Sequence, residues 1–164
     1  MAYKGYKYTL QDIAKHLNLS PNYLCDIVKT QETRESRIEI KRGHERILYV
    51  DDEPALKKLG EIFLSSIGYQ VTSFSSPTEA LKTFKESPES FDILIADQTM
   101  PELPGSSLAQ QIKVLRPDFP VIICTGYSDT MDENKARELG FNALLMKPFE
   151  KDVLSNKLRE IFDG

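Results

Sequence analysis

The feature that most limits the fold of this 164-residue sequence is a regular alternation, from residue 47 onward, between short apolar runs and amphipathic stretches. Each apolar run is rich in β-branched residues and ends in polar or turn-forming residues, which indicates a short buried strand. Strands that alternate with helices form a parallel sheet with helices on both faces. We therefore predict an α/β fold with strands at "ILYV" (47–50), "QVTSF" (70–74), "FDILIAD" (91–97), "PVIICT" (120–125) and "ALLM" (143–146).

The amphipathic stretches between these runs predict five helices. Their apolar residues recur at helical spacing and should form the buried stripe of each helix. Ser76 followed by Pro77 predicts a capped helix start, and Gly140 predicts a C-terminal cap. The expected helices include residues 56–67, 77–85 and 130–140, with stripes at Leu56, Leu59, Phe63 and Ile67, at Leu108, Ile112 and Leu115, and at Val153, Leu158 and Ile161.

Chemically reactive side chains lie at the carboxyl ends of four of the five predicted strands, either as the last strand residue or directly after it. Asp51 and Asp52 follow the first strand, Asp97 ends the third, Thr125 ends the fourth, and Lys147 follows the fifth. A single Asp after a strand is usually a turn former. In open parallel sheets, however, sites form beyond the carboxyl ends of the strands, so five such residues together predict one site.

Four motifs at these strand ends resemble those of the receiver domain of two-component response regulators. They are "VDDE" (50–53), "DQTMPELPG" (97–105), "CTGYSD" (124–129) and "MKPF" (146–149). The resemblance covers about residues 44–164. It implies a flavodoxin-like, doubly wound (βα)5 fold with strand order 2-1-3-4-5, and a signalling domain rather than an enzyme with turnover on substrates.

The resemblance also implies a chemistry for the site. Asp97 would accept a phosphoryl group from a histidine kinase or a histidine phosphotransfer protein. Mg²⁺ would be held by Asp51, Asp52, Asp97 and the backbone carbonyl of Thr99, which would offset the repulsion between the carboxylates. Lys147 and Thr125 would contact the phosphoryl group, and the Lys147–Pro148 bond would be cis.

The sequence departs from the family pattern at one position. The family often has Tyr or Phe three residues before the lysine, where this sequence has Leu144. Either another side chain reports the switch, or Tyr127 takes over that role. We also expect Tyr127 and Thr99 to flank the path of attacking water and to tune the lifetime of the phosphate.

Residues 10–29, "LQDIAKHLNLSPNYLCDIVK", form a small N-terminal helical segment that resembles a helix-turn-helix of AraC-type regulators. The resemblance places Asn22 and Tyr23 on the DNA-reading helix and Lys15 and Lys29 near phosphates. Asp26 on the same face disfavours DNA. The alternatives are a hairpin that docks on a partner or forms a homodimer, and a vestigial segment.

The charge distribution divides the chain. Residues 1–46 hold nine Lys or Arg and six Asp or Glu, a net charge of +3, whereas residues 47–164 carry −7. We predict a helix-turn-helix-like segment at 1–30, a charged linker at 31–45 and the receiver at 46–164. The output is either DNA binding or, for a receiver-only phosphorelay intermediate, a protein contact made by the N-terminal hairpin.

Composition excludes several other classes. No apolar run is long enough to span a membrane, and two distant cysteines, Cys25 and Cys124, fit a reducing cytoplasm. A flavin-binding domain is disfavoured because three Asp residues would repel its phosphate. A haloacid-dehalogenase-like phosphatase would need a D-x-D motif, and the chain has no nucleotide-binding kinase motif with which to make its own phosphoryl donor.

Overall fold

The computed structural model describes residues 40–126 and 131–164, which belong to one compact unit. The predicted helix-turn-helix, including Lys15, Asn22, Tyr23 and Lys29, lies outside the described residues, as does Tyr127. Within the described part of the chain, no helix is long and apolar enough to cross a membrane.

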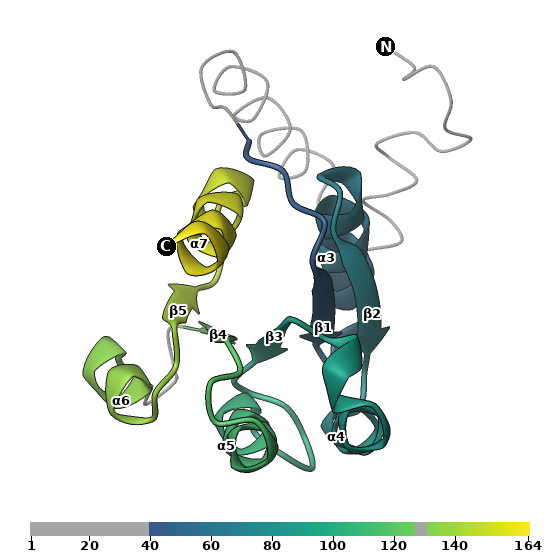
Figure 1. The fold of residues 1–164 in the computed structure, drawn as a ribbon, viewed down its shortest axis with the longest axis vertical. Helices are drawn as coiled ribbons and strands as arrows, with labels where there is room; N and C mark the ends of the chain where they lie inside the picture. The colour runs from purple at the N-terminus through teal and green to yellow at the C-terminus, as the bar shows by residue number, and fades with distance from the viewer. Residues whose placement is uncertain (1–39, 127–130) are drawn as a thin grey trace. The chain divides into compact units, whose positions relative to one another are not determined.

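A five-stranded parallel sheet forms the centre of the described unit (Figure 1). Its order is β2-β1-β3-β4-β5, which confirms the predicted fold class and topology. β3 lies between β1 and β4, and all five of its residues are buried, as expected for a central strand of a doubly wound sheet. The strands are β1 (Arg46–Val50), β2 (Gln70–Phe74), β3 (Ile93–Asp97), β4 (Val121–Thr125) and β5 (Ala143–Met146).

Helices cover both faces of this sheet. Figure 1 shows α3 and α7 on one face and α4, α5 and α6 on the other. A short 3-10 helix (Pro88–Ser90) between α4 and β3 was not predicted from the sequence. The helices are α3 (Pro54–Ser66), α4 (Pro77–Glu86), α5 (Gly105–Leu115), α6 (Glu133–Glu138) and α7 (Lys151–Asp163).

Each face of the sheet has its own hydrophobic core, because successive strand side chains point to opposite faces. Phe84 of α4 is fully buried in the larger core, where its ring stacks with Phe91 at 6.0 Å and meets Phe119 edge-on at 4.9 Å. Leu64 of α3 and Leu158 of α7 are fully buried in the core on the other face. The two cores fix the strands, and with them the side chains at the strand ends.

Three predicted core residues are exposed. Leu59 is 59 % exposed, Leu115 is 46 % exposed and Val153 is 43 % exposed. The stripe of α3 that faces the sheet is centred between Phe63 and Leu64, so Leu59 lies roughly 90° away around the helix. The stripe of α7 contains Leu154 and Leu158, which likewise turns Val153 towards solvent.

The predicted caps are present. Ser76 precedes α4 and its side chain accepts a hydrogen bond from the Glu79 amide, with Pro77 in the first helical position. Gly140 adopts a positive φ of 72° just after α6. α4 begins at Pro77 as predicted, whereas α6 ends at Glu138, two residues before the predicted end at residue 140.

Candidate functional site

Two buried carboxylates lie at the carboxyl ends of adjacent strands. Asp97 is the last residue of β3, and Asp51 directly follows β1. β1 and β3 are paired, with Val50 opposite Ala96, so the two aspartates emerge side by side at one edge of the sheet. Asp51 is only 2 % exposed, and one of its oxygens accepts a hydrogen bond from the Glu53 amide at 3.0 Å.

Lys147 joins these two carboxylates. Its Nζ lies 2.8 Å from Oδ2 of Asp51 and 2.6 Å from Oδ1 of Asp97. Lys147 directly follows β5, and its backbone amide donates to the carbonyl of Thr125 at 2.7 Å. The structure therefore brings together three of the predicted site residues around one ammonium group.

The charge balance at this site depends on those two contacts. Burial alone would lower the pKa of Lys147, but its hydrogen bonds to Asp51 and Asp97 reverse the effect, so the pKa lies above the usual lysine value. Lys147 therefore keeps its positive charge at neutral pH where it contacts the two carboxyl groups. Burial raises the pKa of the neighbouring Cys124 thiol to about 12, so this side chain stays neutral.

The loop after Asp97 is tightly constrained. The second oxygen of Asp97 accepts a hydrogen bond from the Thr99 amide at 3.1 Å. Gly105 begins α5 against the backbone of Asp97, because a Cβ added there would lie 2.1 Å from the Asp97 carbonyl oxygen. The side chain of Gln98 accepts from the Ser106 amide at 3.1 Å and donates to the Ser106 hydroxyl at 3.2 Å.

Glu102 ties this loop to the start of α4. Glu102 has a positive φ of 66°, a conformation that non-glycine residues adopt rarely. Its carboxylate accepts hydrogen bonds from the Thr78 hydroxyl at 2.8 Å and the Ser76 hydroxyl at 3.2 Å. The loop that carries Thr99 is thus held at both ends, which sequence spacing alone did not indicate.

The remaining predicted residues lie at the same end of the sheet. Thr125 is buried at the end of β4, and its hydroxyl lies 3.4 Å from the Gly126 carbonyl oxygen, to which it donates. Asp52 is half-buried, and Thr99 is exposed. Leu144, at the position where the family often has an aromatic ring, packs against the larger core. The Lys147–Pro148 bond is cis, as the resemblance implies.

The donor set fits a hard divalent cation. Mg²⁺ usually binds one or two carboxylates together with waters and phosphate oxygens, and Asp51 and Asp97 supply two carboxylates within reach of one cation. Among residues 40–126 and 131–164, no group of three or more His, Cys, Asp or Glu side chains is arranged to hold a metal ion. The fit therefore rests on two carboxylates, and Asp52 and the Thr99 carbonyl as further ligands stay predictions.

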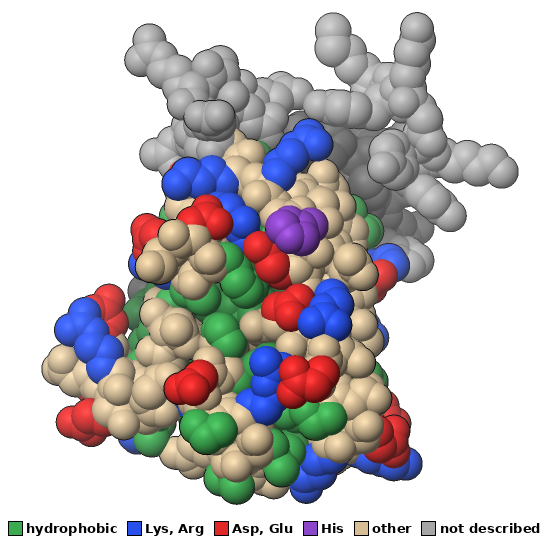
Figure 2. Space-filling view, in the orientation of Figure 1, with side chains coloured by type: hydrophobic (Ala, Val, Ile, Leu, Met, Phe, Trp, Pro, Cys, Tyr) green, Lys and Arg blue, Asp and Glu red, His purple; other side chains and the backbone are tan. Residues whose placement is uncertain are grey.

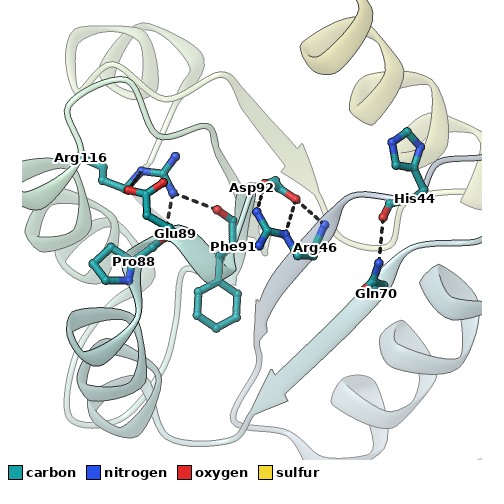
Figure 3. Close-up of polar contacts among 8 residues, drawn as sticks. All are labelled: His44, Arg46, Gln70, Pro88, Glu89, Phe91, Asp92 and Arg116. Carbon is teal, nitrogen blue, oxygen red and sulfur yellow. Dashed lines mark hydrogen bonds and ion pairs between the residues drawn. The ribbon is translucent and has the colours of Figure 1, made fainter.

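The amino ends of the strands carry a separate polar network (Figure 3). Arg46, the first residue of β1, forms a two-point contact with the carboxylate of Asp92, with N–O distances of 2.9 and 2.6 Å. Arg116 donates to the carbonyls of Pro88 and Phe91. A hollow of about 510 Å³ lies here, lined by His44, Glu45, Arg46, Gln70, Asp92, Arg116 and Phe162.

Acidic and basic side chains are interspersed on the face shown in Figure 2, and neither sign covers it alone. The described part of this face is therefore not a single-sign surface of the kind that attracts nucleic acid.

The polar network at the amino ends of the strands could not be predicted from the sequence, because its partners are far apart along the chain.

Comparison with known proteins agrees with the geometry at the carboxyl ends. Residues 47–159 match the model of the response regulator receiver domain. Over 117 residues, 71 % of this chain, the sequence is 35 % identical to a probable transcriptional regulator, ycf27, of Porphyridium aerugineum, of which 48 % is covered. It is 29 % identical over 136 residues to the two-component response regulator ARR22 of Arabidopsis thaliana, with 82 % of this chain and 94 % of that protein covered.

The fold is similar to solved structures as well. The crystal structure of a response regulator receiver domain protein from Clostridium thermocellum superposes with a TM-score of 0.69 and 33 % identity, covering 73 % of this chain and 94 % of that one. The chain spans about half the length of the ycf27 relative and nearly all of ARR22.

Proposed function

Because this chain belongs to the response regulator receiver family, we propose that Asp97 accepts a phosphoryl group from a phosphorylated histidine of a partner kinase or phosphotransfer protein. The observation that carries this proposal is the contact of Lys147 with both Asp97 and Asp51. In this contact, the carboxylate that would act as the nucleophile lies beside a lysine ammonium and a second carboxylate.

The proposed transfer begins with attack by a carboxylate oxygen of Asp97 on the phosphorus. The new O–P bond forms as the P–N bond to the partner histidine breaks, and the departing imidazole nitrogen takes up a proton from water. Such transfer depends mainly on alignment and on neutralisation of the charge on the phosphoryl oxygens. Bound Mg²⁺ would supply part of that neutralisation.

The chain's own residues have separate parts in this transfer. The Thr99 amide holds one oxygen of Asp97 and so orients the carboxylate. Asp51, with Asp52 and the Thr99 carbonyl, is the proposed cation-binding set. Lys147 would exchange its contact with Asp97 for one with a phosphoryl oxygen, and the Thr125 hydroxyl would donate to another.

The proposed output is DNA binding through residues 10–29, with Asn22 and Tyr23 on the reading helix and Lys15 and Lys29 at phosphates. The description of the ycf27 relative as a probable transcriptional regulator supports this. The competing output is a protein contact, in which residues 10–29 dock on a partner or pair in a homodimer. ARR22, a two-component response regulator of which 94 % is covered by the match, supports a receiver-only intermediate.

Phosphoryl acceptance is tested with a purified, ³²P-labelled histidine phosphotransfer protein mixed with the full chain. We expect label to move to this protein in Mg²⁺ and not in excess EDTA, and Asp97→Asn to abolish the transfer. Asp92→Asn, at the opposite end of the sheet, is the matched control and should accept label normally. Equal labelling of Asp97→Asn and wild type would overturn the proposal.

The output is tested by fluorescence anisotropy of a labelled DNA duplex with the full chain, with and without beryllofluoride and Mg²⁺ as a phosphoryl mimic. DNA binding should weaken steeply as salt rises. The Lys15→Ala, Lys29→Ala double variant should weaken it, whereas Lys58→Ala, an exposed lysine on α3, should not. Absence of salt-sensitive binding in every state would favour the protein-contact output.

A further inference from the structure

Residues 40–45, which precede β1, are attached to the rest of the unit. Ile40 packs against the core formed with α3 and α7. The Gly43 amide donates to the Ile67 carbonyl at 3.1 Å, and a Cβ at Gly43 would lie 2.2 Å from the Tyr69 ring. The chain therefore leaves the unit towards residue 39 along a defined path.

A partly buried ion pair links this segment to the last helix. Glu45 accepts a hydrogen bond from the guanidinium of Arg159, and the two side chains are only 14 % and 12 % exposed. The guanidinium lies 5.7 Å from the centre of the Tyr69 ring and 5.2 Å from that of Phe162. We call Glu45, Arg159, Tyr69 and Phe162 the α7 clamp.

The charges in the clamp stabilise each other. Burial alone would raise the pKa of Glu45, but the bond to Arg159 and two backbone amides lower it, and the net result is a pKa below the usual range. Burial raises the pKa of Tyr69 although the charge of Arg159 opposes this, so its hydroxyl stays protonated. The clamp thus keeps the same charge state across the neutral pH range.

Residues 44–46 are also bonded to the sheet, through contacts with Gln70 and Asp92 (Figure 3). The side-chain amide of Gln70 donates to the His44 carbonyl at 3.4 Å, and Arg46 is held by Asp92. Glu45 lies between these anchors. The clamp therefore joins α7 to a segment whose next residues are fixed to the strands.

Helix α7 connects the two ends of the unit. It begins at Lys151, four residues after Lys147, and Arg159 lies eight residues further on, about 12 Å along the helix axis. Lys147 contacts Asp97 at the carboxyl ends of the strands, whereas the clamp lies at their amino ends. Lys147 of the Asp97 site therefore lies just before α7, and Arg159 of the α7 clamp lies near the end of the same helix.

From this arrangement we propose that the α7 clamp couples the state of the Asp97 site to residues 40–45, so that a change at Lys147 alters how firmly the segment leading to residues 1–39 is held. This inference rests on the proposed function. A receiver whose additional segment precedes β1 would then signal to that segment through the Glu45–Arg159 pair.

Amide hydrogen exchange on the full chain tests the coupling. The reporter is the Gly43 amide, measured with and without beryllofluoride and Mg²⁺. We expect its exchange rate to change by about fivefold or more, a modest allosteric coupling. Arg159→Met and Glu45→Gln should each abolish that change. Lys157→Met, which removes a neighbouring charge on the same helix, should leave it intact.

Reciprocity gives a second measurement. Coupling in free energy acts in both directions, so Arg159→Met, which loosens the hold on residues 40–45, should also change the beryllofluoride affinity. Arg159→Lys, which keeps the charge, should restore part of both effects. An unchanged beryllofluoride affinity in Arg159→Met would overturn the coupling.

Two further amides separate failure of the coupling from failure of the proposed function. The Thr99 and Lys147 amides lie at the Asp97 site, bonded to Asp97 and to the Thr125 carbonyl. If both respond to beryllofluoride and Gly43 does not, the coupling is wrong and the site is right. If none responds, the proposed function fails first.

Discussion

Replacement of Lys147 with methionine removes the ammonium that contacts both Asp51 and Asp97. Two buried carboxylates would then face each other without this cation. Breaking a buried ion pair by removing one partner costs about 3–5 kcal/mol. Lys147 is 23 % exposed, so water can partly replace it, and we expect the lower end, about 3 kcal/mol of unfolding free energy.

That loss is readily measured. About 3 kcal/mol corresponds to a drop in melting temperature of roughly 10 °C for a unit of this size. The assay is thermal unfolding of wild type and Lys147→Met by circular dichroism, in EDTA and in excess Mg²⁺. Mg²⁺ should raise the melting temperature of the variant more than that of the wild type, because the cation restores the missing positive charge.

Lys157→Met is the matched control, because it removes an exposed lysine of α7 whose only role in the contacts described is an ion pair with Glu160. It should change the melting temperature little, since exposed pairs contribute about 0–1 kcal/mol. If Lys147→Met is as stable in EDTA as the wild type, the ammonium does not stabilise the two carboxylates. An equal response of both proteins to Mg²⁺ would lead to the same conclusion.

Three other substitutions test the loop after Asp97, the larger hydrophobic core and the Arg46–Asp92 pair. Gly105→Ala should cost about 2–3 kcal/mol and slow phosphorylation, because its Cβ would meet the Asp97 backbone at 2.1 Å; denaturant unfolding and the transfer assay check both effects. Phe84→Ala should cost about 4 kcal/mol by leaving a cavity between two aromatic rings, again measured by denaturant unfolding, and a loss below 1 kcal/mol would contradict the packing described. The pKa of Asp92 lies below its usual range because Arg46 bonds to it, so its stabilising effect is present above pH of about 4 and is lost as the pH falls further. Asp92→Asn should therefore flatten the decline of melting temperature below that pH, and an unchanged decline would show that the pair contributes nothing.

The strands and their ends could be predicted because the physics that places them is local. A strand buried on both faces must be apolar along its whole length, so "FDILIAD" identified the central strand β3. Parallel strands bring their carboxyl ends to one edge, so Asp51, Asp97 and Lys147 could be assigned to one site before any distance was known. The cap residues Ser76 and Gly140 could also be predicted, because each affects only the nearest turn of its helix.

The ion pairs at the amino ends of the strands could not be predicted from the sequence, because they join positions that are distant along the chain. Glu45 and Arg159 are 114 residues apart, and Arg46 and Asp92 are 46 apart, so no periodicity relates either pair. The exposure of Leu59 follows from the direction in which α3 faces the sheet, which hydrophobic spacing alone left undetermined. The roles predicted for Tyr127 and for residues 10–29 fall outside the described residues and stay predictions.

Asp97 is proposed to carry the phosphoryl group, and chemical location of that group decides this first. Phosphorylated full-length protein is reduced with borohydride, which converts an aspartyl phosphate to homoserine, and the peptides are sequenced by mass spectrometry. We expect homoserine at position 97 and aspartate at positions 51 and 52. Homoserine at position 51 or 52, or intact aspartate at 97 in protein that carries the label, would contradict this expectation.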